Sequence, residues 1–97
     1  MDRLERIAAM EEKLNSSLEA VRALDRALEN YRAARGDIRA LADYLSGDDW
    51  RADYAADEAG LLPADLPRGV LSEDGIYALL EEDDELRREL RALAEEL

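Results

Sequence analysis

The sequence contains no histidine, no cysteine and no phenylalanine. Without histidine and cysteine, the common zinc sites, disulfide bonds and Ser/His or Cys/His nucleophile pairs are excluded. Lys13 is the only lysine, and no glycine is followed by the Lys-Ser or Lys-Thr pair of a phosphate-binding loop. We therefore expect no catalytic residues, no cofactor and no enzymatic activity, and we do not expect a small-molecule ligand.

Long hydrophobic runs are also missing, since no stretch approaches the ~18 apolar residues that a membrane span needs. The first ten residues include Asp2, Arg3, Glu5 and Arg6, and no apolar segment follows them, so they do not form a secretory signal. A chain without cysteine suits a reducing compartment. We expect a cytoplasmic protein that does not bind membranes.

Helix-forming residues dominate what is present. The 97 residues are 47% hydrophobic, mostly leucine and alanine, and 39% charged. Leucine, alanine, glutamate and arginine favour helices, whereas the β-branched residues typical of strands are scarce. A chain of this length forms one domain. Composition therefore predicts a single all-α domain covering residues 1–97.

The first predicted helix covers residues 2–35, a stretch without glycine or proline. Its large apolar residues follow the seven-residue repeat of a coiled coil, and they are Ile7, Met10, Leu14, Val21, Leu24, Leu28 and Tyr31, with Ser17 as a polar exception. About 33 helical residues span roughly 50 Å, and a helix this long requires a partner along its apolar face. We expect it to pack against another helix.

Gly36-Asp37 interrupts this pattern, either as a kink or as a full turn. The pattern then predicts short helices at residues 37–45 and 49–59, the second closed by Gly60, and a Pro/Gly-rich loop at residues 60–71.

The last predicted helix covers residues 72–97. Ser72 is a good N-cap, and Leu71 and Ile76 occupy the positions of a hydrophobic staple. The expected fold is a three- or four-helix bundle, in which the long N-terminal helix packs antiparallel on the C-terminal helix.

Negative charge is concentrated in one part of the chain. The net charge is −12, and residues 46–85 carry thirteen acidic and only two basic side chains. Such a field repels nucleic acid and anionic membranes but permits a basic protein partner. We expect no direct nucleic-acid binding.

Three aspartates four residues apart, Asp49, Asp53 and Asp57, form an acidic stripe on a helix, and Glu58 adjoins it. Carboxylates at this spacing are weak candidates for a Mg²⁺ or Ca²⁺ site. Carboxylate spacing alone is a poor signature, so we expect a solvated or capping face and no metal.

Two sets of ion pairs are predicted. Asp83 with Arg87 and Asp84 with Arg88 stand four residues apart within the acidic run 81–85, in the favoured order. Arg68 is expected to pair with one of the acidic residues near it in sequence, which are Asp53, Asp57, Asp65 and Glu73.

Trp50, Tyr54 and Tyr77 are expected to form an aromatic cluster. Tryptophan and tyrosine are enriched at binding hot spots, yet large aromatics also dominate burial in small cores. We favour a core position for Trp50.

The segment from Trp50 to Tyr77 contains, in order, W-x-x-D-Y, D-E-x-G, L-P-x-D-L and R-G-V-L-S-E-D. It resembles the signature of a family of small, uncharacterised bacterial helical proteins with a domain of unknown function. The resemblance covers nearly the whole chain and implies no activity. Gly75 departs from the pattern where a more helix-prone residue is expected, and Ala56 where a more polar one is. The candidate interaction or signature residues are Trp50, Asp53, Tyr54, Asp57, Asp65, Arg68, Gly69, Ser72, Glu73, Asp74 and Tyr77.

Three functions are compatible with these features. The first is a non-enzymatic helical interaction or scaffold module that binds a protein partner or associates with itself through the long helix. The second is an acidic inhibitor or nucleic-acid mimic that binds a basic protein. The third, ranked far behind, is a divalent-metal-dependent enzyme that uses the acidic stripe.

Overall fold

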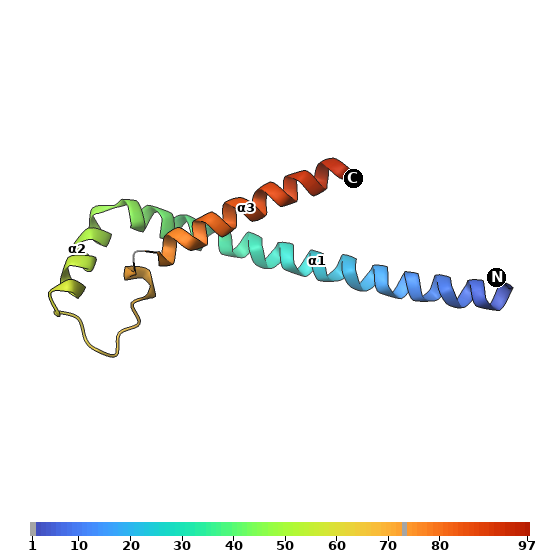
Figure 1. The fold of residues 1–97 in the computed structure, drawn as a ribbon, viewed down its shortest axis with the longest axis horizontal. Coiled ribbons are helices and arrows are strands. Elements are labelled where there is room, and N and C mark those ends of the chain that lie inside the picture. The colour runs from blue at the N-terminus through green and yellow to red at the C-terminus, as the bar shows by residue number, and fades with distance from the viewer. Residues whose placement is uncertain (1, 73) are drawn as a thin grey trace. The chain divides into compact units, whose positions relative to one another are not determined.

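A computed structural model of the chain describes residues 2–72 and 74–97 (Figure 1). Its elements in chain order are α1 (Arg3–Ser46), α2 (Asp48–Glu58), the short 3₁₀ helix η1 (Gly69–Leu71) and α3 (Gly75–Glu96). The described residues form helices and no strand, which confirms the predicted all-α fold. None of the helices in this part of the chain is long and apolar enough to cross a membrane.

Helix α1 runs without a break from Arg3 to Ser46, so Gly36-Asp37 is not a full turn between two separate helices. Its start is capped by Asp2, whose Oδ1 accepts a hydrogen bond from the Glu5 backbone N–H at 2.7 Å. A glycine inside a helix costs only about 1 kcal/mol relative to alanine. The apolar residues after Gly36 continue the helical spacing, and this outweighs the cost.

The chain divides after Arg35 into two units, the N-terminal helical segment (residues 2–35) and the C-terminal unit (residues 36–97). The N-terminal helical segment consists of α1 residues and the capping Asp2, and none of its described residues is buried. A single helix cannot bury its own apolar side chains. These residues therefore have no core of their own.

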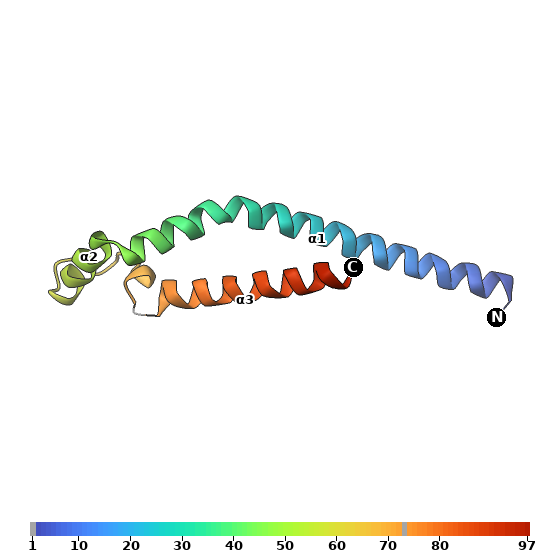
Figure 2. The same cartoon turned by 90° about the horizontal axis from the view of Figure 1, so that it is seen from above.

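The C-terminal unit contains a small core. Leu71 and Ile76 are 7% and 3% exposed, and they are the two buried residues among those described. The end of α1 and the start of α3 run in opposite directions in this unit, as predicted (Figure 2). Leu41 of α1 and Leu79 of α3 line an open groove of about 440 Å³ next to Ile76. The core thus lies where η1 meets the start of α3.

Helix α3 begins at Gly75, three residues after the predicted start. The predicted capping bond is nevertheless present, because Ser72 Oγ accepts a hydrogen bond from the Gly75 backbone N–H at 3.0 Å. Ser72 has the extended backbone of an N-cap, with φ −70° and ψ 144°. The side chain of Ser72 thus bonds to the first residue of α3, although the residue at the N-cap position is Asp74.

Helix α2 ends at Glu58, and Gly60 lies two residues later with a left-handed backbone, φ 71°. The Gly60 N–H donates to Asp57 O, and the Leu61 N–H donates to Ala56 O, both at 3.0 Å. These two bonds satisfy carbonyl groups at the end of the helix. The chain then turns into the irregular segment that leads to η1 (Figure 1).

Candidate interaction site

Trp50 connects α2 to the residues before α3. Its indole Nε1–H donates a hydrogen bond to the Val70 carbonyl oxygen at 2.8 Å. Its ring stacks on Tyr54, one helical turn later, with centroids 5.1 Å apart and an interplanar angle of 19°. Both side chains are half-buried. Trp50 therefore contacts residues of the C-terminal unit, but it is half-buried and is not one of the two buried core residues.

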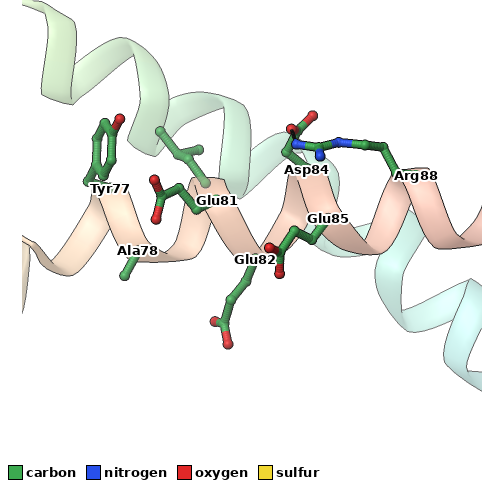
Figure 3. Close-up of a pocket in the computed structure, with 8 residues that line it drawn as sticks. Tyr77, Ala78, Glu81, Glu82, Asp84, Glu85 and Arg88 are labelled. Atoms are coloured by element: carbon green, nitrogen blue, oxygen red, sulfur yellow. Dashed lines mark hydrogen bonds and ion pairs between the residues drawn. The ribbon is translucent and has the colours of Figure 1, made fainter.

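Tyr77 does not join this pair, so the predicted three-residue aromatic cluster is wrong. Its side chain is 58% exposed on α3, and its ring lies on the same part of that helix as Glu81 (Figure 3). Because α3 begins at Gly75, Tyr77 lies in its first turn, directly after the buried Ile76.

Arg68 links the loop to α2 through three groups. Its Nη1 lies 2.6 Å from Asp57 Oδ1, which confirms the predicted pairing with one of the nearby acidic residues. Its Nη2 donates to the Pro63 carbonyl at 2.8 Å, and its Nε donates to the Leu66 carbonyl at 3.3 Å. The guanidinium thus holds the loop in place against the last turn of α2. Asp65, in the same loop, is exposed.

Replacing Arg68 with alanine is expected to lower the free energy of unfolding by about 1–2 kcal/mol, because a partly buried charged hydrogen bond and two loop contacts are lost. Arg68→Lys is expected to recover less than half of this loss, because a single ammonium cannot reach three acceptors in different directions. Urea denaturation of both variants measures the difference. A lysine variant as stable as the wild type would show that only the charge matters.

Tyr44 and Asp53 form a second link within the C-terminal unit. The Tyr44 hydroxyl donates to Asp53 Oδ2 at 2.7 Å, joining the end of α1 to α2. This hydrogen bond, with smaller contributions from desolvation and from the charges of Asp53 and Asp49, raises the pKa of Tyr44 from 10.0 to about 12. The phenol is therefore protonated at neutral pH and acts as a hydrogen-bond donor.

This pKa shift predicts a loss of stability in alkali. A group whose pKa is raised by folding stabilises the folded state below its ordinary pKa, and that contribution disappears as the pH rises from 10.0 to about 12. Asp53→Asn should return the pKa of one tyrosine towards its ordinary value, because the negative acceptor is removed. Ultraviolet titration of tyrosinate measures it, with Tyr44→Phe as the control that removes the same transition. Identical titrations of the wild type and Asp53→Asn would contradict the assignment.

The acidic run on α3 is partly neutralised by arginines within the same helix. Arg87 Nε lies 3.1 Å from Asp83 Oδ2, and Arg88 Nη2 bonds to Asp84 Oδ2, so both predicted pairs are confirmed. The hydrogen bond and charge of Arg88 lower the pKa of Asp84. Figure 3 shows Glu82 projecting from the side of α3 opposite to the Asp84–Arg88 pair. The three glutamates of this run, Glu81, Glu82 and Glu85, are exposed to solvent.

The four weak candidates for metal ligands do not share a common site. Asp53 accepts from Tyr44 and Asp57 pairs with Arg68, whereas Asp49 and Glu58 are exposed on α2. Across residues 2–72 and 74–97, no group of three or more acidic side chains comes close enough together to hold a metal ion. The acidic stripe is thus divided between hydrogen bonds of the fold and solvent.

The remaining candidate residues surround the start of α3. Ser72 Oγ donates to the Gly69 carbonyl at 2.9 Å while it caps Gly75. Asp74 is exposed and precedes the first helical residue, and its own side chain makes no capping bond. Glu73 lies outside the described residues. The described signature residues that form bonds thus connect α2, the loop and the start of α3 to one another.

Gly75 has a structural role that sequence reasoning missed. A Cβ atom at this position would lie 2.3 Å from the Gly69 carbonyl oxygen and 2.7 Å from Ser72 Oγ. No side chain fits in that space, so glycine is required by a close approach of two backbone segments. The sequence contained one indication of this role, which was a glycine at a position where a helix-prone residue is expected. From the sequence alone, it indicated only a weak start of the helix.

Comparison with known proteins gives one match. Residues 7–93 match a family described as "Domain of unknown function (DUF4298)". No curated protein and no solved structure matches the chain.

Proposed function

The chain belongs to this family of domains of unknown function, and we propose that it is a non-enzymatic helical module that binds protein partners. The bonded signature residues of the C-terminal unit hold its own segments together, and the exposed apolar face of the N-terminal helical segment is the surface that we propose for recognition. The proposal keeps the cytoplasmic location expected from the sequence.

The observation that carries the proposal is a series of exposed apolar side chains on one face of the N-terminal helical segment. We define the apolar stripe as the large apolar residues of the N-terminal helical segment with side chains 38–77% exposed, which are Leu4, Ile7, Met10, Leu14, Leu18, Val21, Leu24 and Leu28. Scattered exposed apolar residues are ordinary, but a contiguous series on one helix face indicates a binding surface.

The proposal is tested by affinity capture from the native cell lysate with the wild-type chain and two variants that carry the same charge change. Leu14→Glu puts a carboxylate in the apolar stripe, and Asn15→Glu puts one beside it, off the stripe. We expect the wild-type chain to capture one or more proteins, among which a second copy of the chain counts. Leu14→Glu should no longer capture them, whereas Asn15→Glu should still do so. Equal recovery with both variants would contradict the proposal.

A second candidate is an acidic inhibitor that binds a basic protein, and the charge of the C-terminal unit favours it. Residues 36–97 carry eighteen acidic and six basic side chains, whereas residues 2–35 carry seven of each. Among the acidic residues, Glu81, Glu82 and Glu85 are exposed on α3 (Figure 3). Attraction between exposed charges is screened over ~10 Å at 0.1 M salt. A partner that is released by moderate salt but unaffected by Leu14→Glu would favour this candidate.

A further inference from the structure

The apolar stripe has the spacing of a helix–helix interface. Ile7, Leu14, Val21 and Leu28 repeat every seven residues, and Met10 and Leu24 each follow a member of this series by three. All six side chains are exposed, and they belong to the N-terminal helical segment, blue to cyan in Figure 1. A seven-residue repeat keeps one apolar seam facing a single partner helix along its length.

The stripe is large enough to form a stable interface. Full burial of a Leu-sized side chain contributes about 1.5–3 kcal/mol. At 25 cal/mol per Å², this free energy corresponds to roughly 60–120 Å² of surface removed from water. The eight side chains of the stripe then give about 500–1,000 Å² for one chain and about 1,000–2,000 Å² for two. Stable protein interfaces bury about 1,200–2,000 Å² in total. Two copies paired along the stripe therefore reach the required size.

The charges of the N-terminal helical segment favour pairing with a second copy in the antiparallel direction. Residues 2–12 carry four acidic and two basic side chains, and residues 22–35 carry two acidic and four basic ones. Antiparallel pairing places each acidic end beside a basic end, whereas parallel pairing places like ends together.

The charge of the C-terminal unit supports the same direction. Residues 36–97 have a net charge of −12, and two such units repel each other when close. In a parallel pair, the two junctions between Arg35 and Gly36, where these units are attached, lie side by side. In an antiparallel pair, the two junctions lie at opposite ends of a helical segment of roughly 50 Å, several times the ~10 Å over which charge acts at 0.1 M salt.

We propose that the partner of the apolar stripe is a second copy of this chain, paired antiparallel along the seven-residue repeat of residues 7–31. This inference rests on the proposed function and specifies its partner. In the alignment that pairs the two seams in full, Met10 faces Leu28 of the partner subunit and Leu14 faces the partner subunit's Leu24. Ser17 lies near the centre of the pair and is its polar position.

Sedimentation equilibrium of the purified full chain tests the association. We expect a dimer that Leu14→Glu weakens at least about a hundredfold, because each dimer then holds two carboxylates in an apolar seam, and that Asn15→Glu leaves unchanged. Ser17→Leu is expected to tighten the dimer about tenfold, because it adds an apolar side chain at the centre. This gain cannot result from misfolding. A wild-type chain that stays monomeric at roughly 100 µM overturns the inference.

Cysteine cross-linking tests the direction, and the chain has no cysteine of its own to interfere. Disulfides form only where the two Cα atoms lie within about 7 Å. Under mild oxidation, a mixture of Met10→Cys and Leu28→Cys chains should cross-link to each other, and neither chain should cross-link to itself. Self-linking of the Met10→Cys chain would show a parallel pair and overturn the antiparallel assignment.

The two proposals fail in different ways. A monomeric purified chain that still captures another protein from lysate, with capture lost in Leu14→Glu, overturns self-association and leaves the interaction module standing. A monomeric chain whose capture is the same for Leu14→Glu and Asn15→Glu overturns both.

Discussion

Replacing Gly75 with alanine is expected to lower the free energy of unfolding of the C-terminal unit by about 2–3 kcal/mol. The added Cβ would lie 2.3 Å from the Gly69 carbonyl oxygen, which is a backbone atom and cannot rotate away. Relief requires η1 to move, and η1 contains the buried Leu71. The same movement breaks the capping bond between Ser72 Oγ and the Gly75 N–H, which adds to the cost.

Trp50 fluorescence during urea denaturation measures this effect, because Trp50 is the only tryptophan and bonds to the Val70 carbonyl in η1. Gly36→Ala is the matched control. Nothing lies within 4 Å of a Cβ at Gly36, and its backbone is not left-handed. That substitution should stabilise α1 by up to about 1 kcal/mol. Similar effects of the two substitutions would show that helix propensity, and not the close approach of Gly69, determines the outcome at Gly75.

These two glycines also show how far sequence reasoning reaches. Local pattern predicted the existence and type of the main helices, because the apolar spacing over residues 2–35 and 76–97 extends over many turns. At Gly36 the prediction gave too much weight to one residue, since the apolar pattern on both sides continues the helix. At Gly75 it could not succeed, because the steric constraint comes from the carbonyl of another segment.

Some contacts of the candidate site could be predicted from local sequence spacing and others could not. The Asp83–Arg87 and Asp84–Arg88 pairs follow from spacing along one helix and were predicted. The pairing of Arg68 was predicted only as one of four choices, since the loop path decides which carboxylate it reaches.

The bonds that required a tertiary path were not predicted. The hydrogen bonds from Tyr44 to Asp53 and from Trp50 to the Val70 carbonyl depend on how α1, α2 and η1 meet. No pattern along one helix contains that information. The sequence signature therefore indicates which residues form one structural unit, but it does not indicate which atoms are in contact.

Replacing Trp50 with alanine is expected to cost about 2–4 kcal/mol, a large fraction of the stability of a small domain. The substitution removes the largest side chain of α2, its stacking on Tyr54, and the donor to the Val70 carbonyl. Stacked aromatic pairs contribute about 0.5–1.5 kcal/mol beyond their buried area. An amide-type hydrogen bond contributes about 1 kcal/mol. Loss of burial accounts for the rest, and it is reduced because Trp50 is only half-buried.

Trp50→Phe separates these contributions, because phenylalanine can keep the stack but has no N–H group to donate. We expect it to cost about 1–2 kcal/mol, with the Val70 carbonyl left without its donor. Urea denaturation followed by circular dichroism gives both values. Since Trp50 lies outside the apolar stripe, a folded Trp50→Phe chain should sediment like the wild type. If that variant were folded and stable but no longer associated, Trp50 would itself be part of the interface, and its bond to Val70 would serve recognition as well as folding.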